Sequence, residues 1–138
     1  MFGISFWLLL LLSSLTAEHE LGVRIDNIPA DYKGKELFVG IWLPGNADFP
    51  QDLKPNIGYK AKITGSSATI RRKLTPGTYA VTVYIDVNGN GRLDKNMIGA
   101  PKEPFGVSNN VVPKLSAPSL ETCLFALKES KTIQIKLQ

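Results

Sequence analysis

The sequence has little of what most enzyme sites and many exported folds rely on. Its 138 residues include one cysteine, Cys123, and one histidine, His19. A single cysteine excludes an intrachain disulfide, so the hydrophobic core alone must hold the fold. A single histidine, near an end that we expect to be disordered, excludes Ser-His-Asp, Cys-His and histidine-metal chemistry. The sequence therefore favours a protein that is not an enzyme, and a carboxylate-based hydrolase is the catalytic alternative.

Charged side chains are missing from the first 17 residues. A leucine run, Leu8–Leu12, is followed by small residues and by Ala17, which is typical of a signal peptide cleaved after Ala17. The run is interrupted too early for a membrane span, which needs about 20 apolar residues. We expect residues 1–17 to be a signal peptide, although the lack of Lys or Arg before the run leaves an uncleaved anchor as an alternative. The mature chain is then secreted or periplasmic, as in a Gram-negative bacterium, with no stable membrane insertion.

A convincing amphipathic helix is also absent after residue 17. Apolar residues instead alternate with a period of two, which predicts β-strands. The expected strands are 21–25, 35–43, 57–64, 68–74, 78–86 and 132–137. The strand at 35–43 is apolar on both faces and is expected to be central. Short strands separated by turns predict an all-β domain over residues 18–138, built as two packed sheets or one small closed sheet.

The net charge and the surroundings of Cys123 each lead to one expectation. The net charge of +4 is too diffuse to indicate nucleic-acid binding. Cys123 alternates with Phe125 and Leu127 in the stretch 120–127. We therefore expect its thiol to be buried in an extended segment, where it acts as a small apolar side chain.

The alternating pattern lapses between Asn88 and Pro118, where glycine and proline recur. So long an irregular segment in a small domain is usually functional or mobile. It begins where the strand 78–86 runs into a loop with oxygen-bearing groups at alternate positions. These groups are Asp86, Asn88, Asn90, the carbonyl of Arg92, and Asp94. Gly91 stands where a calcium loop needs a sharp turn, and calcium prefers six to eight oxygen ligands. The loop is therefore a candidate calcium site.

The match to known calcium loops is incomplete. Met97 occupies the twelfth position, where an EF-hand has glutamate, and a strand rather than a helix precedes the loop. Glu103 is the candidate third carboxylate if the chain folds back. With few charges, we expect an affinity on the order of 10⁻⁴–10⁻³ M. The alternative is a metal-free turn, because Asn-Gly pairs tolerate positive φ and favour hairpins.

A second polar cluster follows the loop, and it gives the candidate ligand-binding residues Lys102, Ser108, Asn109 and Asn110. Such side chains could bind a partner, either an unknown protein or a surface glycan. Serine and asparagine more often hydrogen-bond the neighbouring backbone in turns. Two hypotheses therefore stay open: a calcium-stabilised binding module, and a metal-free structural or adhesive module.

Two stretches, 74–94 and 98–110, resemble the exported bacterial family catalogued as domain of unknown function number 2141. They carry Asp-x-Asn-x-Asn-Gly-x-Leu-Asp over 86–94, Gly-x-Pro-Lys-Glu over 99–103, and Ser-Asn-Asn over 108–110. This chain departs from the family at 105–107, where an aromatic pair around glycine is commoner. The resemblance implies an exported bacterial protein with a sandwich-like fold and no established enzyme activity. The Pro-Gly-x-Tyr entry at 76–79 is also similar to prealbumin-type modules. The fold we expect is a single immunoglobulin-like or prealbumin-like β-sandwich of about seven strands.

Overall fold

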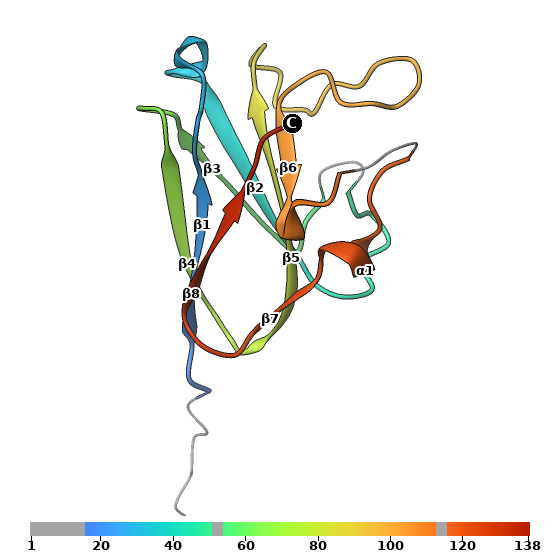
Figure 1. The fold of residues 1–138 in the computed structure, drawn as a ribbon. Helices are drawn as coiled ribbons and strands as arrows, with labels where there is room; N and C mark the ends of the chain where they lie inside the picture. Colours follow the sequence, from blue (N-terminus) through green and yellow to red (C-terminus); the bar gives the residue numbers. More distant parts are fainter. Residues whose placement is uncertain (1–15, 51–53, 113–115) are drawn as a thin grey trace, which may run out of the picture.

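The computed structural model describes residues 16–50, 54–112 and 116–138. These residues form eight strands in two sheets and one short α-helix (Figure 1). The strands are β1 (His19–Ile25), β2 (Glu36–Trp42), β3 (Ile57–Lys62), β4 (Ala68–Leu74), β5 (Gly77–Asp86), β6 (Phe105–Val107), β7 (Phe125–Leu127) and β8 (Lys131–Ile135). The smaller sheet has the order β4-β1-β8, and the larger has the order β3-β2-β5-β6, with β7 also paired to β5. The expectation of a mainly β fold is confirmed.

The hydrophobic core is made by side chains from both sheets. On each strand the residues at alternate positions share one face. In β1 these are Leu21, Val23 and Ile25, and they belong to the same buried cluster as alternate residues of β2 and β5. Burial of this apolar surface supplies most of the driving force for folding. The two sheets therefore pack on one common core.

Strand β2 is central, as its two apolar faces predict. It pairs antiparallel with β3 on one side and with β5 on the other. Strand β5 is the longest, and its second edge is shared: Gly77–Tyr79 pair with β7, whereas Thr82–Tyr84 pair with β6. This division leaves a short gap in the ladder between the two partners.

Three local expectations were wrong. Cys123 is not in an extended segment, because Leu120–Cys123 forms the helical turn α1 and the strand β7 begins only at Phe125. The irregular stretch 88–118 contains β6. His19 begins β1 and pairs with Leu74, so it does not lie in a disordered end. The helical turn α1 and the strand β6 are short, and β1 begins two residues before its apolar alternation; tertiary contacts fix all three features, and a local pattern does not encode them.

Gly106 shows why β6 left no pattern in the sequence. A Cβ atom at this position would lie 2.6 Å from both the backbone oxygen of Lys136 and Cγ2 of Ile135. Only glycine allows the C-terminal segment to approach so closely. The contact is reinforced by the backbone of Phe105 and Gln138, which exchange two hydrogen bonds. The position therefore serves a long-range contact rather than a strand face.

The thiol of Cys123 is fully buried, as the sequence predicts, and burial raises its pKa. The signal peptide expected at residues 1–17 falls almost entirely on residues 1–15, which lie outside the described residues. Within the described part of the chain, no helix is long and apolar enough to cross a membrane.

Candidate functional site

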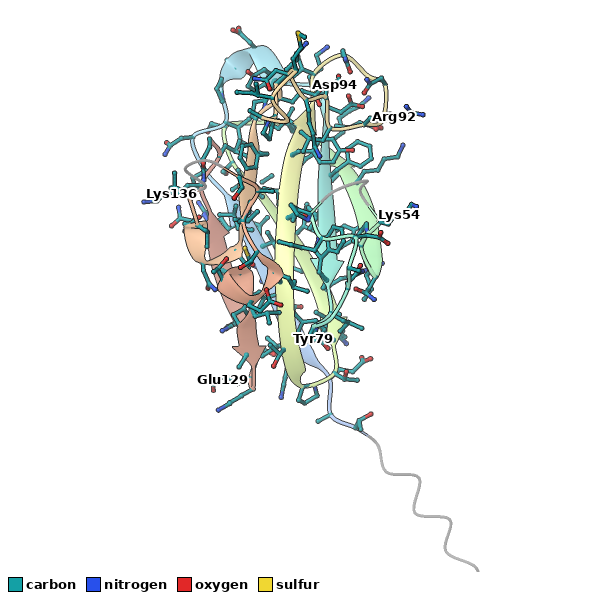
Figure 2. The ribbon with its side chains drawn as sticks, turned by 90° about the vertical axis from the view of Figure 1, so that its right-hand side faces the viewer. Lys54, Tyr79, Arg92, Asp94, Glu129 and Lys136 are labelled. Carbon is teal, nitrogen blue, oxygen red and sulfur yellow. The ribbon has the colours of Figure 1, made fainter. Side chains whose placement is uncertain are left out.

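The candidate calcium loop leaves the end of β5 at one end of the molecule. Figure 2 shows Arg92 and Asp94 at this end, opposite Tyr79 and Glu129. The loop turns sharply at Gly89 and Gly91, whose φ angles are 75° and 74°. This left-handed region favours glycine. The Asn-Gly repeats therefore give the loop its curvature.

Asp86 holds the loop through hydrogen bonds to its backbone. Its side chain is buried, with 3% exposure. One carboxylate oxygen accepts a hydrogen bond from the backbone N–H of Gly89 at 3.1 Å, and the other accepts from Gly91 at 2.8 Å. Charge-assisted bonds of this kind are stronger than neutral ones. Asp86 thus fixes the loop against the end of β5.

Asn88 and Asn90 each stabilise the turn that follows them. Their Oδ1 atoms accept from the backbone N–H two residues ahead, at 3.2 Å for Asn90 and 2.9 Å for Arg92. These are Asx turns. Their side-chain amides both donate to the carboxylate of Asp94, with distances of 2.8 and 3.0 Å from Asn90. Asn88, Asn90 and Asp94 therefore converge, as the sequence spacing suggested.

Glu103 folds back under the loop and is buried, with 6% exposure. Its Oε1 accepts from the backbone N–H of Val87 at 2.9 Å, and its Oε2 accepts from that of Asp94 at 3.2 Å. Both oxygens therefore hold the loop backbone. The neighbouring Lys102 is exposed, and its backbone N–H donates to the carbonyl of Asp94.

The loop and its surroundings carry three carboxylates: those of Asp86 and Asp94 in the loop, and that of Glu103 next to it. Among the described residues, none of Asp86, Asp94 and Glu103 takes part in an ion pair. Tyr84 lies next to them, and its pKa is raised by burial and by these three carboxylates together with Glu36. Its hydroxyl stays protonated and donates to the carbonyl of Gly91 at 3.3 Å. The loop thus carries carboxylates that are balanced only by N–H donors in this part of the structure.

The described residues hold no group of three or more His, Cys, Asp or Glu side chains in an arrangement that could bind a metal ion. A cation at this loop would depend on the asparagine oxygens and on backbone carbonyls in addition to two carboxylates. Met97, at the twelfth position, is fully exposed and supplies no oxygen from its side chain.

The second polar cluster is engaged in hydrogen bonds to the backbone. The buried Ser108 accepts from the N–H of Val81 at 2.9 Å and donates to the carbonyl of Cys123 at 2.6 Å. Asn109 donates to two carbonyls, those of Thr122 and Leu124. Asn110 donates to one carbonyl and accepts one backbone N–H, both from the segment 134–136. This is the backbone-bonding alternative, and it ties β6 to the C-terminal segment.

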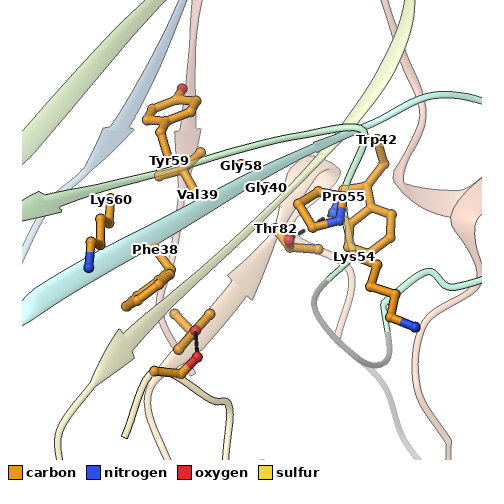
Figure 3. Close-up of a pocket in the computed structure, with 12 residues that line it drawn as sticks. Phe38, Val39, Gly40, Trp42, Lys54, Pro55, Gly58, Tyr59, Lys60 and Thr82 are labelled. Carbon is orange, nitrogen blue, oxygen red and sulfur yellow. Dashed lines mark hydrogen bonds between the residues drawn. The ribbon is translucent and has the colours of Figure 1, made fainter. Parts of the chain in front are cut away.

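A hollow that the sequence did not predict lies on the outer face of the larger sheet. Its volume is about 440 Å³, and its lining includes Phe38, Gly40, Gly58 and Thr82 (Figure 3). The only sign of this hollow in the sequence is that Gly40 lies between two aromatic residues, Phe38 and Trp42, at alternate positions of one strand. The partners on β3 and β5 could not be known without the register.

Comparison with known proteins gives one match. The model of the family described as "Uncharacterized protein conserved in bacteria (DUF2141)" matches residues 23–135. Neither the curated proteins nor the solved structures contain a match to this chain.

Proposed function

We propose that this chain, which belongs to the DUF2141 family, is an exported β-sandwich module that binds calcium through the Asp86–Asp94 loop. The sandwich is of the immunoglobulin-like or prealbumin-like kind. The module is secreted or periplasmic after its signal peptide is removed, and it is not an enzyme. It binds a partner, an unknown protein or a surface glycan, on the face formed by the loop.

The observation that carries this proposal is that oxygen-bearing side chains gather on a loop whose carboxylates have no cationic partner among the described residues. Asp86 is buried without a cationic partner among the described residues. Burying a carboxylate is costly unless charge or hydrogen bonds compensate it. The donor set consists of oxygen atoms, which is what calcium requires. Asp86, Asn88, Asn90, Asp94 and the carbonyl of Arg92 would hold the ion.

The partners of Asp94 support the same interpretation. Its carboxylate is met by two amide groups, from Asn88 and Asn90, which place partial positive charge in the middle of the loop. A calcium ion would supply that charge more strongly and would replace the amides. Glu103, which the sequence suggested as a further ligand, has both oxygens bonded to loop N–H groups. Asp86 makes the same kind of bonds, to the N–H groups of Gly89 and Gly91, but it stands at the first position of the alternating pattern. Glu103 lies outside that pattern, so we assign it the role of holding the loop.

The metal-free structural or adhesive module is the second candidate. It is favoured by the same hydrogen bonds, which already satisfy the carboxylates of Asp86 and Asp94 without an ion. A carboxylate-based hydrolase is less well supported. It would need Asp86 or Glu103 in an enclosed pocket, and neither lines the two hollows found among the described residues.

Thermal melting in calcium tests the proposal. With a Kd on the order of 10⁻⁴–10⁻³ M, about 10 mM calcium should stabilise the fold by about 1.4–2.7 kcal/mol. The melting temperature should therefore rise by several degrees, and a chelator should reverse the rise. The Asp86→Ala, Asp94→Ala double variant should respond to neither.

The matched control is the Glu121→Ala, Glu129→Ala double variant. It removes the same charge from exposed positions outside the loop, and it should keep the full response to calcium. A melting curve of the native chain that does not change across millimolar calcium would sink the proposal in favour of the metal-free module.

A further inference from the structure

The outer face of the larger sheet carries a row of small residues that crosses the strands. The register places Gly40 of β2 opposite Gly58 of β3 on one side and opposite Thr82 of β5 on the other. On each strand, the residues two positions before and after the row share the same face. Their side chains project from the sheet on both sides of the row. The row therefore forms the floor of a slot in which Gly58 is exposed. Gly40 is covered by Pro55 and by the Trp42 ring, each of which has an atom 3.0 Å from where a Cβ of residue 40 would lie.

Aromatic side chains form one wall of the slot. The rings of Phe38 and Tyr84, on neighbouring strands, are stacked with centroids 4.8 Å apart and planes 12° apart. Because the two rings stack across the strands, their faces are turned toward each other and their edges are turned toward the slot. Ring edges carry partial positive charge, so they favour oxygen-rich ligands. Figure 3 shows Pro55 and Trp42 on the opposite side of the glycines.

Thr82 brings a directed polar group to the floor. Nε1 of the fully buried Trp42 donates to the Thr82 hydroxyl oxygen at 2.9 Å. This bond fixes the hydroxyl and leaves its proton to be donated to a ligand. The partly exposed Thr82 can therefore recognise a hydroxyl or a carboxylate oxygen lying in the slot.

The slot continues across the sheet. A second hollow, of about 290 Å³, lies over β5 and β6 and shares Thr82 and Tyr84 with the first, which has about 440 Å³. Ligand sites commonly occupy about 300–1,000 Å³. Two adjoining hollows that cross four strands suit an extended polymer better than one small molecule.

The charges along the two hollows have one sign. Lys54 and Lys60 line the first hollow and Lys95 lines the second, and no Asp or Glu is among the described lining residues. Lys60 pairs with Glu36 at 3.3 Å, whereas Lys54 and Lys95 are in no ion pair within the described ranges. Asp86, Asp94 and Glu103 lie close enough to Tyr84 to raise its pKa, but they line neither hollow. The lining thus complements repeated negative charge.

We propose that an acidic polysaccharide, a polymer of sugar rings bearing carboxylates, binds across this outer face. The proposal rests on the proposed role of an exported binding module and adds a second binding surface, separate from the face formed by the loop. An extended peptide is the less favoured class, because peptide recognition by a sheet uses a free strand edge. The slot instead crosses the face of the sheet, and two of its floor strands, β2 and β5, already pair on both sides, whereas β3 is an edge strand.

Titration calorimetry with oligogalacturonate tests the proposal. The native chain should bind it, and binding should weaken as salt is raised. Lys54→Gln combined with Lys95→Gln should lower the affinity about tenfold. Gly58→Leu should abolish binding, because the new Cβ meets only Pro55, at 3.2 Å, and the side chain then fills the slot. The melting temperature of each variant checks that it folds.

The controls separate this site from general charge and from the calcium loop. Lys73→Gln combined with Lys128→Gln removes equal charge from exposed positions outside the hollows and should leave the affinity unchanged. The Asp86→Ala, Asp94→Ala variant should also bind, so the slot and the calcium site can fail independently. The proposal is overturned if the neutral methyl ester of the same oligomer or an oligoglutamate peptide binds as tightly, or if Gly58→Leu binds normally.

Discussion

Replacing Glu103 with alanine is expected to lower the free energy of unfolding by about 2–4 kcal/mol. The buried carboxylate accepts from the N–H groups of Val87 and Asp94, which have no other acceptor among the described residues. Glu103→Gln keeps one acceptor oxygen and should cost about half as much. Urea unfolding measured by tryptophan fluorescence would give both values.

The control for this prediction is Glu129→Ala, which removes an exposed carboxylate on the far end of the molecule and should change stability by no more than about 0.5 kcal/mol. Both Glu103 variants should lose stability in the presence and in the absence of calcium. If Glu103→Gln were destabilising only in calcium, Glu103 would be an ion ligand rather than a support for the loop.

Replacing Ser108 with alanine is expected to cost about 2–4 kcal/mol as well. Its hydroxyl bridges Val81 N–H and Cys123 C=O. One edge of β5 pairs first with β7 and then with β6, and Val81 lies between these two paired parts. Its N–H therefore has no strand partner on that side. The substitution would leave a buried donor and a buried acceptor unsatisfied.

Ser67→Ala is the matched control, because Ser67 is exposed in a turn, and it should leave the melting temperature within about two degrees. A Ser108→Ala protein as stable as the native chain would show that water replaces the hydroxyl. The bridge would then not be needed to join the segments that meet at the β5 edge.

The sequence predicted the long strands well because each has a clear period of two and a buried face. In β1 and β5 the alternation of apolar residues is set by contact with one core, so the local pattern reports the tertiary structure. The short elements β6 and α1 left no such pattern. The Gly106 position is decided by the C-terminal segment, about 30 residues away in the sequence.

The candidate site was predictable only where its residues are close in sequence. The spacing of Asp86, Asn88, Asn90 and Asp94 was sufficient to place them together, because a tight loop brings alternate residues to one point. The burial of Glu103 beneath that loop depends on how the chain returns. The slot was not predictable, since Gly40, Gly58 and Thr82 become neighbours only through strand register.

A crystal structure grown in millimolar calcium would show whether the Asp86–Asp94 loop binds the ion. We expect one ion, with oxygens of Asp86, Asn88, Asn90 and Asp94 at about 2.3–2.6 Å. The amides of Asn88 and Asn90 should no longer donate to Asp94. An ordered loop that keeps both amide-to-carboxylate bonds and shows no ion density would contradict the claim.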